Sequence, residues 1–248
     1  MNSIQPINLS PSFLSRLLLK GYDYATAEKL GLIKKETSTM NAGKVMHSYL
    51  SGAYGGKQDK IAISPYDDFR TKEARDWRDK QPDNVLIIKQ KEADLYAELT
   101  ERVKSHPEVK KILEGATIEA ERIVERKVKQ YNVKGILDIV ATKGDVVDVI
   151  DWKFVGSQVF DDFAKKALWQ HYDLQASVYD FLKNATHIYF VTIENEAPYR
   201  IKVWHCSPDM LESGATKFDK ALNIIKNENW RQPTFDITGV EDIKAWGF

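Results

Sequence analysis

The sequence predicts an α/β fold in which a mixed central β-sheet is flanked by helices. Apolar residues first recur at helical spacing in "NLSPSFLSRLL", where Ser10 and Pro11 suit the N-cap and the first helical residue. The apolar spacing then changes to two in "TIEAERIVERKVKQYNVKGILDIVATKGDVVDVIDWKF", as on strands. Helices and strands alternate after this stretch, an order that favours helices packed on the faces of one sheet.

The elements are expected in the following chain order. Helices follow Ser10, cover residues 41–52 and run up to about Lys104, and a break near Pro107 then precedes a short helix closed by Gly115. Residues 54–88 are expected to be irregular, with "DDFRTKEARDWRDK" as an exposed helix or loop. Three or so strands then precede one helix over "FDDFAKKALWQHYDLQASVYDFLKN", two strands in "HIYFVTIENEAPYRIKVWHCS" and a closing helix over "PDMLESGATKFDKALNIIKNENW".

The length of 248 residues suits one domain, because single α/β domains commonly reach roughly 200 to 250 residues. We expect a mainly helical part over residues 1–115 and a part over 116–205 that holds the sheet and the helix after it. A C-terminal helix and tail would then occupy residues 206–248.

The composition excludes several classes of protein. The 36 basic and 36 acidic residues cancel, so any binding of nucleic acid must depend on local patches rather than on a global field. No apolar run approaches the roughly 18 residues of a membrane span, and "MNSIQPINLS" lacks the features of a signal peptide, so we expect a cytoplasmic protein. The single Cys206 permits neither an intramolecular disulfide nor a four-cysteine iron–sulfur cluster.

Two neighbouring strands carry charged residues among apolar ones, in "GILDIVATKGDVVDVIDWKF". Alternation places Val149, Asp151 and Lys153 on one face of the second strand. If the two strands close as a hairpin with an even-numbered loop, Asp138 pairs across from Val149 and lies diagonal to Asp151. Two carboxylates and an ammonium then converge. An odd-numbered loop would turn Asp138 to the other face.

Two carboxylates at such a point repel each other unless a cation lies between them. Oxygen ligands with open positions suit Mg²⁺, or Mn²⁺ as a substitute, and an ion held in this way readily binds a phosphate oxygen. A neighbouring lysine can orient a water molecule, help to remove its proton or balance charge in a phosphodiester transition state. The pattern therefore indicates phosphodiester hydrolysis, with a salt bridge between strand-end residues as the structural alternative.

Three further residues accompany this pattern. Gln175 and Tyr179 lie four residues apart in "QASVY", on one face of the helix after the strands, and His47 lies on an early helix in "GKVMH". Taken alone, each has an ordinary explanation, as helix packing or as a hydrogen-bonded core histidine. Taken together and in this order, "GKVMH", "GILD", "DWK" and "QASVY" resemble the PD-(D/E)xK nuclease superfamily, in the branch with a Gln-x-x-x-Tyr helix and an upstream histidine.

Segments along nearly the whole chain resemble the RecE-type exonucleases, also called exonuclease VIII, of phages and prophages. They include "SPSFLSRLL", "NAGKVMHSYL", "SHPEVKKILEGATIEAE", "VTIENEAPYRIKVWHCSPDMLESGATKFDKAL" and "DIKAWGF". The resemblance implies a Mg²⁺-dependent enzyme of the bacterial cytoplasm, phage or prophage encoded, that degrades the 5′-ended strand of linear duplex DNA. It also implies a ring-shaped homo-oligomer and a single-strand annealing partner that takes up the 3′ overhang in DNA recombination.

The same resemblance implies a role for each site residue. His47, Asp138, Asp151 and the Trp152 carbonyl would ligate the metal, Lys153 would activate water, and Gln175 with Tyr179 would support the site or the DNA end. Glu119 and Glu121 are candidates for an additional acid, although both lie on one face of the first strand and could equally be solvated.

The chain departs from the family pattern around the site. Trp152 replaces the usual leucine, and Phe154 replaces a small or hydroxylated residue after the lysine. "GIL" precedes Asp138 where a basic residue and proline are common. These departures change the packing behind the site more than its chemistry.

Basic residues near the predicted site form a candidate DNA track, whose members are Arg122, Arg126, Lys127 and Lys129 along the first strand and Lys165 with Lys166 before the Gln175 helix. Such residues would contact phosphates without reading sequence. The alternative is an ordinary solvated face.

Two other interpretations remain open. The nearer is another nuclease of the superfamily, such as a structure-specific endonuclease or an enzyme of the CRISPR-adaptation type. The more distant is a non-catalytic DNA-binding recombination scaffold on the same fold, against which the intact set of Asp138, Asp151 and Lys153 argues.

Overall fold

The computed structural model describes residue 4 and residues 6–33 and 38–234. Its main sheet has five strands in chain order, β3 (Thr117–Val128), β4 (Tyr131–Lys143), β5 (Val146–Val155), β6 (His187–Glu194) and β7 (Ile201–His205). Neighbouring strands are antiparallel except β5 and β6, which are parallel. A parallel pair needs a long crossover, here through three helices. The mixed sheet flanked by helices confirms the predicted fold class.

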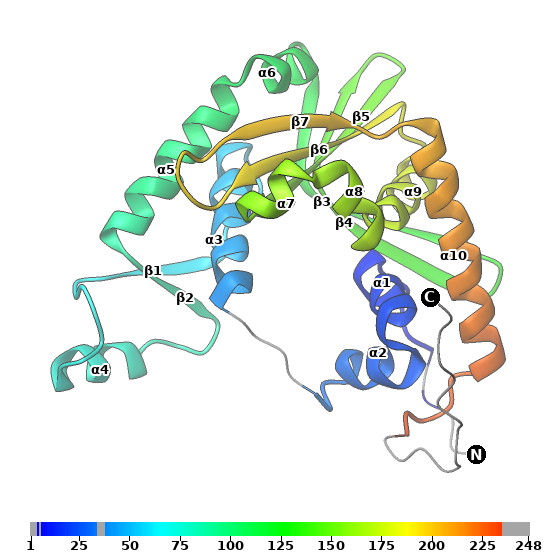
Figure 1. Ribbon diagram of the computed structural model, residues 1–248, viewed down its shortest axis with the longest axis horizontal. Helices are drawn as coiled ribbons and strands as arrows, with labels where there is room; N and C mark the ends of the chain where they lie inside the picture. Colours follow the sequence, from blue (N-terminus) through cyan, green and yellow to red (C-terminus); the bar gives the residue numbers. More distant parts are fainter. Residues whose placement is uncertain (1–3, 5, 34–37, 235–248) are drawn as a thin grey trace, which may run out of the picture.

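Each face of the sheet is covered by its own helices and its own hydrophobic core (Figure 1). One core, called the α9 core below, is built with α1 (Pro11–Lys20), α2 (Tyr22–Lys29), α9 (Tyr172–Lys183) and α10 (Pro208–Glu228). The other, called the α3 core, is built with α3 (Ser38–Ala53), α5 (Gln90–Ser105) and α6 (Pro107–Leu113). The expected cap is present, because Ser10 Oγ accepts a hydrogen bond from the Phe13 amide at 3.2 Å.

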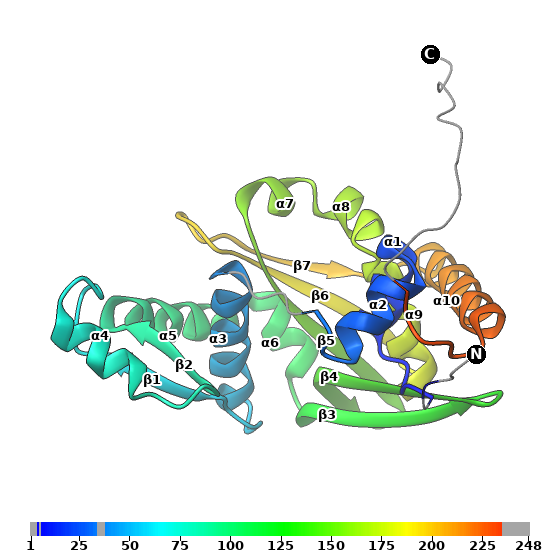
Figure 2. The same ribbon diagram turned by 90° about the horizontal axis from the view of Figure 1, so that it is seen from below.

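The expectation for residues 54–88 is confirmed for the exposed helix within "DDFRTKEARDWRDK" and wrong for the rest, which was expected to be irregular. This stretch contains β1 (Lys60–Ser64) and β2 (Val85–Lys89), which pair in parallel as a separate two-stranded sheet, and α4 (Lys72–Asp79) crosses between them. Figures 1 and 2 show this unit at the far end of α5, away from the main sheet. Each strand has five residues, too few for a clear alternation of apolar and polar positions.

The single helix expected after β5 is also wrong in detail. The chain forms α7 (Ser157–Asp161), α8 (Phe163–Trp169) and α9, separated at Asp162 and at Gln170–His171. His171 adopts the left-handed conformation, with φ 58° and ψ 35°. Histidine is among the residues that enter this region more often than most, but neither glycine nor proline marks the break, so the helical spacing concealed it.

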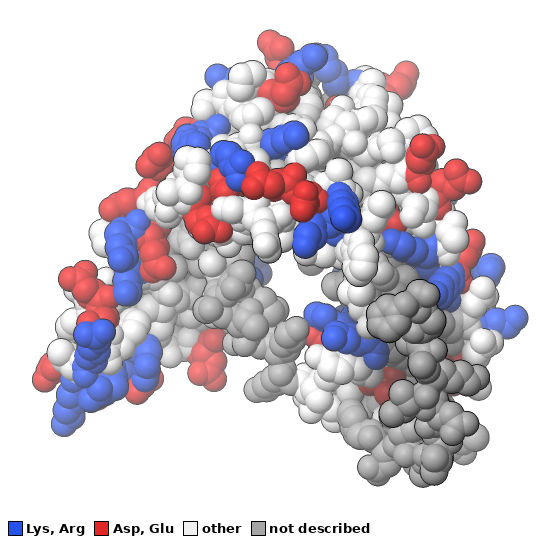
Figure 3. All heavy atoms as spheres, viewed as in Figure 1, with Lys and Arg blue, Asp and Glu red and all other residues white. Residues whose placement is uncertain are grey.

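The helices and the small sheet form two limbs on either side of a hollow. Figure 1 shows α1, α2 and α10 as one limb and α3, α5, α4, β1 and β2 as the other, and Figure 3 shows the surface hollowed between them in the same view. Among the residues described, no helix is long and apolar enough to cross a membrane. The closing "DIKAWGF" lies outside the described residues.

Candidate active site

The β4–β5 hairpin brings the two candidate aspartates to one point. Lys143 pairs with Val146 around a two-residue turn, in which Gly144 has φ +58°, as the first position of a type II′ turn requires. The loop is therefore even-numbered, and the ladder runs only as far as Ile139 opposite Ile150. Asp138 and Asp151 are the next residues of the two strands.

One detail of the predicted register is wrong. Val149 pairs with Val140 rather than with Asp138, so the register differs by two residues from the expected one. A shift of two preserves the face of every side chain. Asp138 thus lies at the level of Asp151 instead of diagonal to it, beyond the last ladder pair.

β3 and β4 change faces at the position of Asp138. Leu137 belongs to the α9 core and Ile139 to the α3 core, although both would share a face on a regular strand. In β3 the same change occurs between Ala120 and Val124. Glu121 has φ +50°, and the pair that would join Glu121 to Asp138 is missing from an otherwise continuous ladder. Asp138 therefore lies where the two cores meet, within reach of helices on both sides of the sheet.

Asp151 and Lys153 meet α9 on the α9 side of β5. The Lys153 ammonium contacts Asp151 Oδ2 and donates a hydrogen bond to Gln175 Oε1 at 2.9 Å. The amide of Gln175 donates to Asp151 Oδ1 at 2.7 Å, and the Tyr179 hydroxyl lies 2.7 Å from the same amide nitrogen. The Tyr179 hydroxyl can donate to Asp151 Oδ1 at 3.2 Å or to the Ile136 carbonyl at 3.1 Å. The helix thus holds the carboxylate and the ammonium in fixed orientations.

Asp138 connects this group to α3. Its Oδ2 accepts a hydrogen bond from the Trp152 amide at 2.8 Å and lies 3.4 Å from His47 Nδ1. His47 is carried by α3, whose Val45, Met46 and Leu50 are buried in the α3 core. The histidine and the aspartates therefore reach the same point from opposite faces of the sheet, an arrangement that the sequence pattern did not specify. The roles assigned to these residues remain predictions.

The charges of the site perturb one another. Burial alone would lower the pKa of His47, but the Asp138 carboxylate outweighs burial and raises that pKa. Burial would raise the pKa of Asp138, yet His47 and Lys153 lower it. For Asp151, burial together with the Asp138 charge raises the pKa despite Lys153. Such opposed shifts in two adjacent carboxyl groups are typical of functional sites.

Lys153 is held as an ammonium ion. Burial would lower its pKa, but Asp151, Tyr172 and Asp138 outweigh burial and raise it. Its Nζ also lies 4.7 Å from the centre of the Tyr172 ring and 5.3 Å from that of Phe190. The sequence analysis missed Tyr172, although it precedes Gln175 by three residues and so shares its helix face.

The residues fit a hard divalent cation by donor chemistry. Asp151 Oδ2 is buried and accepts no hydrogen bond of standard geometry, so one oxygen faces the site without full compensation. Two carboxylates and the Trp152 carbonyl are oxygen donors of the kind that Mg²⁺ or Mn²⁺ accepts, and the His47 imidazole lies beside them. In the arrangement described, no three His, Cys, Asp or Glu side chains are close enough together to hold an ion. The Lys153 ammonium supplies the positive charge at Asp151 instead.

The two candidates for an additional acidic residue, Glu119 and Glu121, lie in clearly different surroundings. Glu119 is partly exposed and pairs with Arg122 at 3.4 Å and Lys183 at 3.8 Å. The pKa of Glu121 is raised by burial and by the nearby Asp138 and Asp59 charges. Its left-handed backbone is costly for a residue with a side chain and is a feature found at functional sites. Glu121 is therefore the better candidate for an additional acidic residue.

The residues that depart from the family pattern fill the α3 core behind the site. Trp152 is 1% exposed and stacks on Tyr54, with ring centres 5.9 Å apart. Phe154 packs edge-to-face on Tyr96 at 6.1 Å. The larger side chains thus belong to the packing behind the sheet, as expected from the sequence.

The candidate DNA track is heterogeneous. Arg126 is tied to the end of α9, because its guanidinium donates to the Phe181 carbonyl at 2.6 Å and to Asn184 Oδ1 at 2.9 Å. Arg122 is 53% exposed beside Glu119. Lys127, Lys129 and Lys165 are exposed, and Lys166 is half-buried.

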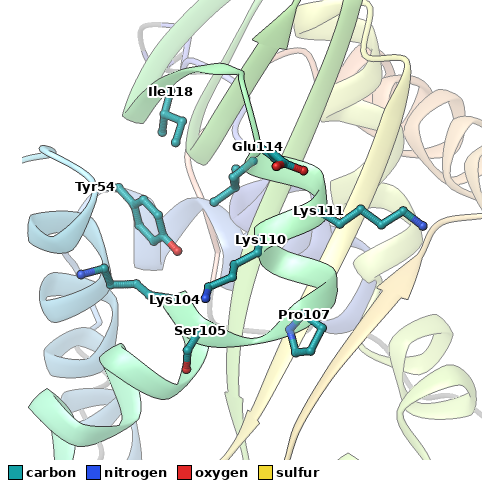
Figure 4. Close-up of a pocket in the computed structure, with 9 residues that line it drawn as sticks. Tyr54, Lys104, Ser105, Pro107, Lys110, Lys111, Glu114 and Ile118 are labelled. Carbon is teal, nitrogen blue, oxygen red and sulfur yellow. The ribbon is translucent and has the colours of Figure 1, made fainter.

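A pocket of about 650 Å³ lies elsewhere and is not the candidate site. Figure 4 shows it between Tyr54 and α6, with Lys110 pointing toward the tyrosine and Lys111 pointing away. Its lining includes Ile118, which packs on the α3 core, and none of the residues of the Asp151 network.

Comparison with known proteins agrees with this fold. Residues 14–233 match the model of a PDDEXK-like domain of unknown function (DUF3799). No curated protein sequence matches the chain. The structure of a candidate exonuclease from Eubacterium rectale is similar with a TM-score of 0.58 and 14% identity, over 89% of this chain and 82% of that one. At this identity the likeness shows the fold alone.

Two further structures are more distant. A phage-related exonuclease from Haemophilus somnus 129PT has a TM-score of 0.39 and 12% identity, over 90% of this chain and 95% of its own. An alkaline exonuclease from Laribacter hongkongensis has a TM-score of 0.35 and 13% identity, over 52% of this chain and 67% of its own.

Proposed function

The chain belongs to the PDDEXK-like family DUF3799, and from this premise we propose that it is a divalent-metal-dependent DNA exonuclease. The observation that carries the proposal is the convergence of Asp138, Asp151 and Lys153, in which the second oxygen of Asp151 is contacted by the Lys153 ammonium and accepts no other hydrogen bond. A purely structural ion pair would have no need of a second, nearby carboxylate that raises the pKa of the first. The fold of the Eubacterium rectale structure, named as a candidate exonuclease, supports the same class.

Each residue has a role in this proposal. His47, Asp138, Asp151 and the Trp152 carbonyl hold the cation, which we take to be Mg²⁺ with Mn²⁺ as a substitute. Such an ion would neutralise phosphate charge and generate a nucleophile from water at neutral pH. Gln175 and Tyr179 keep the Asp151 carboxylate and the Lys153 ammonium in orientation.

Lys153 acts first as a positive charge. Its raised pKa favours the ammonium form, which stabilises charge that develops on the transferred phosphoryl group. An ammonium ion cannot accept a proton, so help in removing a proton from water would first require Lys153 to lose its own. Displacement of Lys153 from Asp151 by the cation would favour this loss, because the Asp151 charge is the largest cause that raises the lysine pKa.

The finer activity rests on the resemblance in sequence. We propose degradation of the 5′-ended strand of linear duplex DNA, with the 3′ overhang passed to a single-strand annealing partner in phage or prophage recombination in the bacterial cytoplasm. A ring of identical subunits would let a neutral chain present basic residues to DNA on one surface only.

One experiment tests metal, ends and polarity together. Linear duplex labelled separately at each 5′ and 3′ end is incubated beside closed circular DNA, with and without Mg²⁺. We expect Mg²⁺-dependent loss of the 5′-ended strands and no change in the circles. Nicking of closed circles would favour an endonuclease of the same superfamily. Absence of all hydrolysis with DNA binding intact would favour a non-catalytic scaffold.

A further inference from the structure

The C-terminal end of α8 exposes apolar surface next to the candidate active site. Trp169 is 74% exposed, more than any other large hydrophobic side chain among the described residues, and Leu168 is 44% exposed. An exposed tryptophan beside a second apolar residue often marks an interaction site. Figures 1 and 2 show α7 and α8 standing off the sheet, between the two limbs in the view of Figure 1.

The exposure does not come from a loose helix end. Phe163 and Ala167 of α8 are buried in the α9 core, and the Leu168 carbonyl accepts a hydrogen bond from Lys217 Nζ at 2.9 Å. The helix is thus fixed to α10 and to the core, while the Trp169 side chain extends away from both. Because the helix is fixed, a ligand that contacts Trp169 orders only its side chain and not the backbone.

The position of Trp169 connects it to the reacting groups. Only Gln170 and His171 separate it from Tyr172, whose ring covers the Lys153 ammonium. Three residues of chain span at most about 10 Å, so the backbone of Trp169 lies within that distance of the Tyr172 backbone. The backbone of the exposed Trp169 is therefore near the element that covers Lys153.

The charge of the same helix suits a nucleic acid. Lys165 is exposed and precedes Trp169 by four residues, which places both on one face of α8. Neither Lys165 nor Lys166 forms an ion pair with any other residue in the described part of the chain. Aromatic rings that stack on bases, next to lysines that contact phosphates, are the usual features of a surface for single-stranded nucleic acid.

We propose that Trp169 stacks on an unpaired nucleobase at the DNA end, with Lys165 and Lys166 on the adjoining phosphates, and so positions the strand for cleavage. This inference rests on the proposed function, because it names the DNA element that the site receives. Trp169 is a positioning residue and takes no part in the chemistry. The rival occupant is a second copy of the chain, packed on Leu168 and Trp169.

Binding without catalysis tests the proposal. A 5′-phosphorylated single-stranded decamer with a fluorescent 3′ label is titrated with the full chain in EDTA, so that hydrolysis does not interfere. We expect Trp169→Ala to weaken binding about tenfold, since stacking on one base contributes about 1 to 3 kcal/mol. Trp169→Phe should keep affinity within about threefold of wild type, because it retains an aromatic face. The matched control is Leu19→Ala, which removes an exposed apolar residue of α1 and should leave binding unchanged.

A kinetic readout separates positioning from folding. On linear duplex with Mg²⁺, Trp169→Ala should raise KM about tenfold while kcat at saturating DNA stays near the wild-type value. Unchanged affinity for the decamer in Trp169→Ala would overturn the inference. So would sedimentation showing that Trp169→Ala dissociates an oligomer, since the apolar pair would then be a subunit contact. A wild-type chain that binds the decamer through Trp169 and hydrolyses no DNA would refute the proposed function alone.

Discussion

Two buried aspartates of this protein, Asp151 and Asp173, have similar surroundings but differ in how completely their carboxylate oxygens accept hydrogen bonds. Their side chains are 3% and 0% exposed, and each contacts one lysine, Lys153 or Lys217. Asp173 accepts hydrogen bonds on both oxygens, from the Leu174 amide, from Lys217 and from Ser213. Asp151 accepts them on Oδ1 only, and its Oδ2 has none of standard geometry.

The difference separates a structural carboxylate from one prepared for a ligand. Burying a charge is costly unless partners occupy its lone pairs, and Asp173 meets this condition by joining α9 to α10. Gly214 makes the approach possible, because a Cβ there would lie 2.0 Å from the Asp173 carbonyl oxygen. At Asp151 the second oxygen is contacted by the Lys153 ammonium instead of by several hydrogen-bond donors, and this is the place that a cation would take.

The sharpest test of this comparison is Asp151→Asn, which should lower nuclease activity by more than about 100-fold, as loss of a metal ligand does. The native pKa of Asp151 is raised, so the folded protein holds its proton more tightly and stability falls as the pH rises from 3.8 through the native value. The asparagine removes that loss but also removes the carboxylate that pairs with Lys153, so the melting temperature at pH 7 gives the net of the two effects. Digestion of end-labelled duplex and thermal melts measure the two effects. A variant with full activity would end the assignment of Asp151 to the site.

Asp173→Ala should show the reverse pattern. It leaves the half-buried Lys217 and the Ser213 hydroxyl without their carboxylate partner, and removing one partner of a buried pair typically costs about 3 to 5 kcal/mol of unfolding free energy. For a chain of this size the melting temperature falls by about 2 to 4 °C for each kcal/mol. Below the melting range, digestion per folded molecule should match wild type. Gly214→Ala is the paired variant, and it should destabilise the protein by the same route. Loss of activity without loss of stability would reverse the roles of the two aspartates.

Cation binding should distinguish the carboxylates of the candidate site from one that only forms ion pairs. Mg²⁺ at about 100 times its dissociation constant should stabilise the wild-type protein by about 2.7 kcal/mol, measured by thermal melts or calorimetry. The stabilisation should disappear in Asp138→Asn and Asp151→Asn and persist in Glu119→Gln, whose carboxylate pairs with Arg122 and Lys183. Equal stabilisation in all four proteins would place the ion elsewhere.

Substitution of a third buried carboxylate, Glu194, should change the melting temperature least. Hydrogen bonds from the Arg200 guanidinium, at 2.8 and 2.9 Å, lower the pKa of Glu194 to about 2. Because this pKa is depressed, its contribution to stability is present above pH 4.5 and is lost as the pH falls toward 2. Glu194→Gln should therefore melt a few degrees lower at pH 7 and approach wild type in acid, with activity at pH 7 retained. Parallel pH–stability curves for the two proteins would contradict this account.

The sequence was sufficient to predict which residues share a face of a strand or a helix, because their spacing follows a simple period. Strand alternation places Asp151 and Lys153 on one face of β5, and the helix period places Gln175 beside Tyr179. Asp138 joins them where β4 changes faces, which no period predicts. The even-numbered turn at Gly144 was one of two alternatives left open, and the register was two residues from the expected one. The candidate DNA contacts could not be judged in this way, because neighbours distant in sequence decide whether a residue such as Arg126 is free.

The periodic spacing of apolar residues gave a wrong prediction where the backbone of a single residue leaves the helical or extended conformation. The left-handed His171 ends a helical pattern without glycine or proline, and Glu121 does the same within a strand. Two five-residue strands, β1 and β2, were missed because their pairing is with each other across a crossover. Glu119 and Glu121 looked equivalent in the sequence, since nothing local reveals which of them the backbone turns toward Asp138.

The positive φ of Glu121 has a practical consequence for engineering this sheet. At such a position glycine relieves the backbone and deletes the carboxylate, whereas glutamine keeps the strained shape and removes only the charge. The effect of the backbone conformation can thus be separated from the effect of the carboxylate charge by comparing the glycine and glutamine substitutions at position 121. A β-branched residue satisfies neither requirement, so natural or designed variants of this strand are restricted at position 121 by stereochemistry before any selection for catalysis acts.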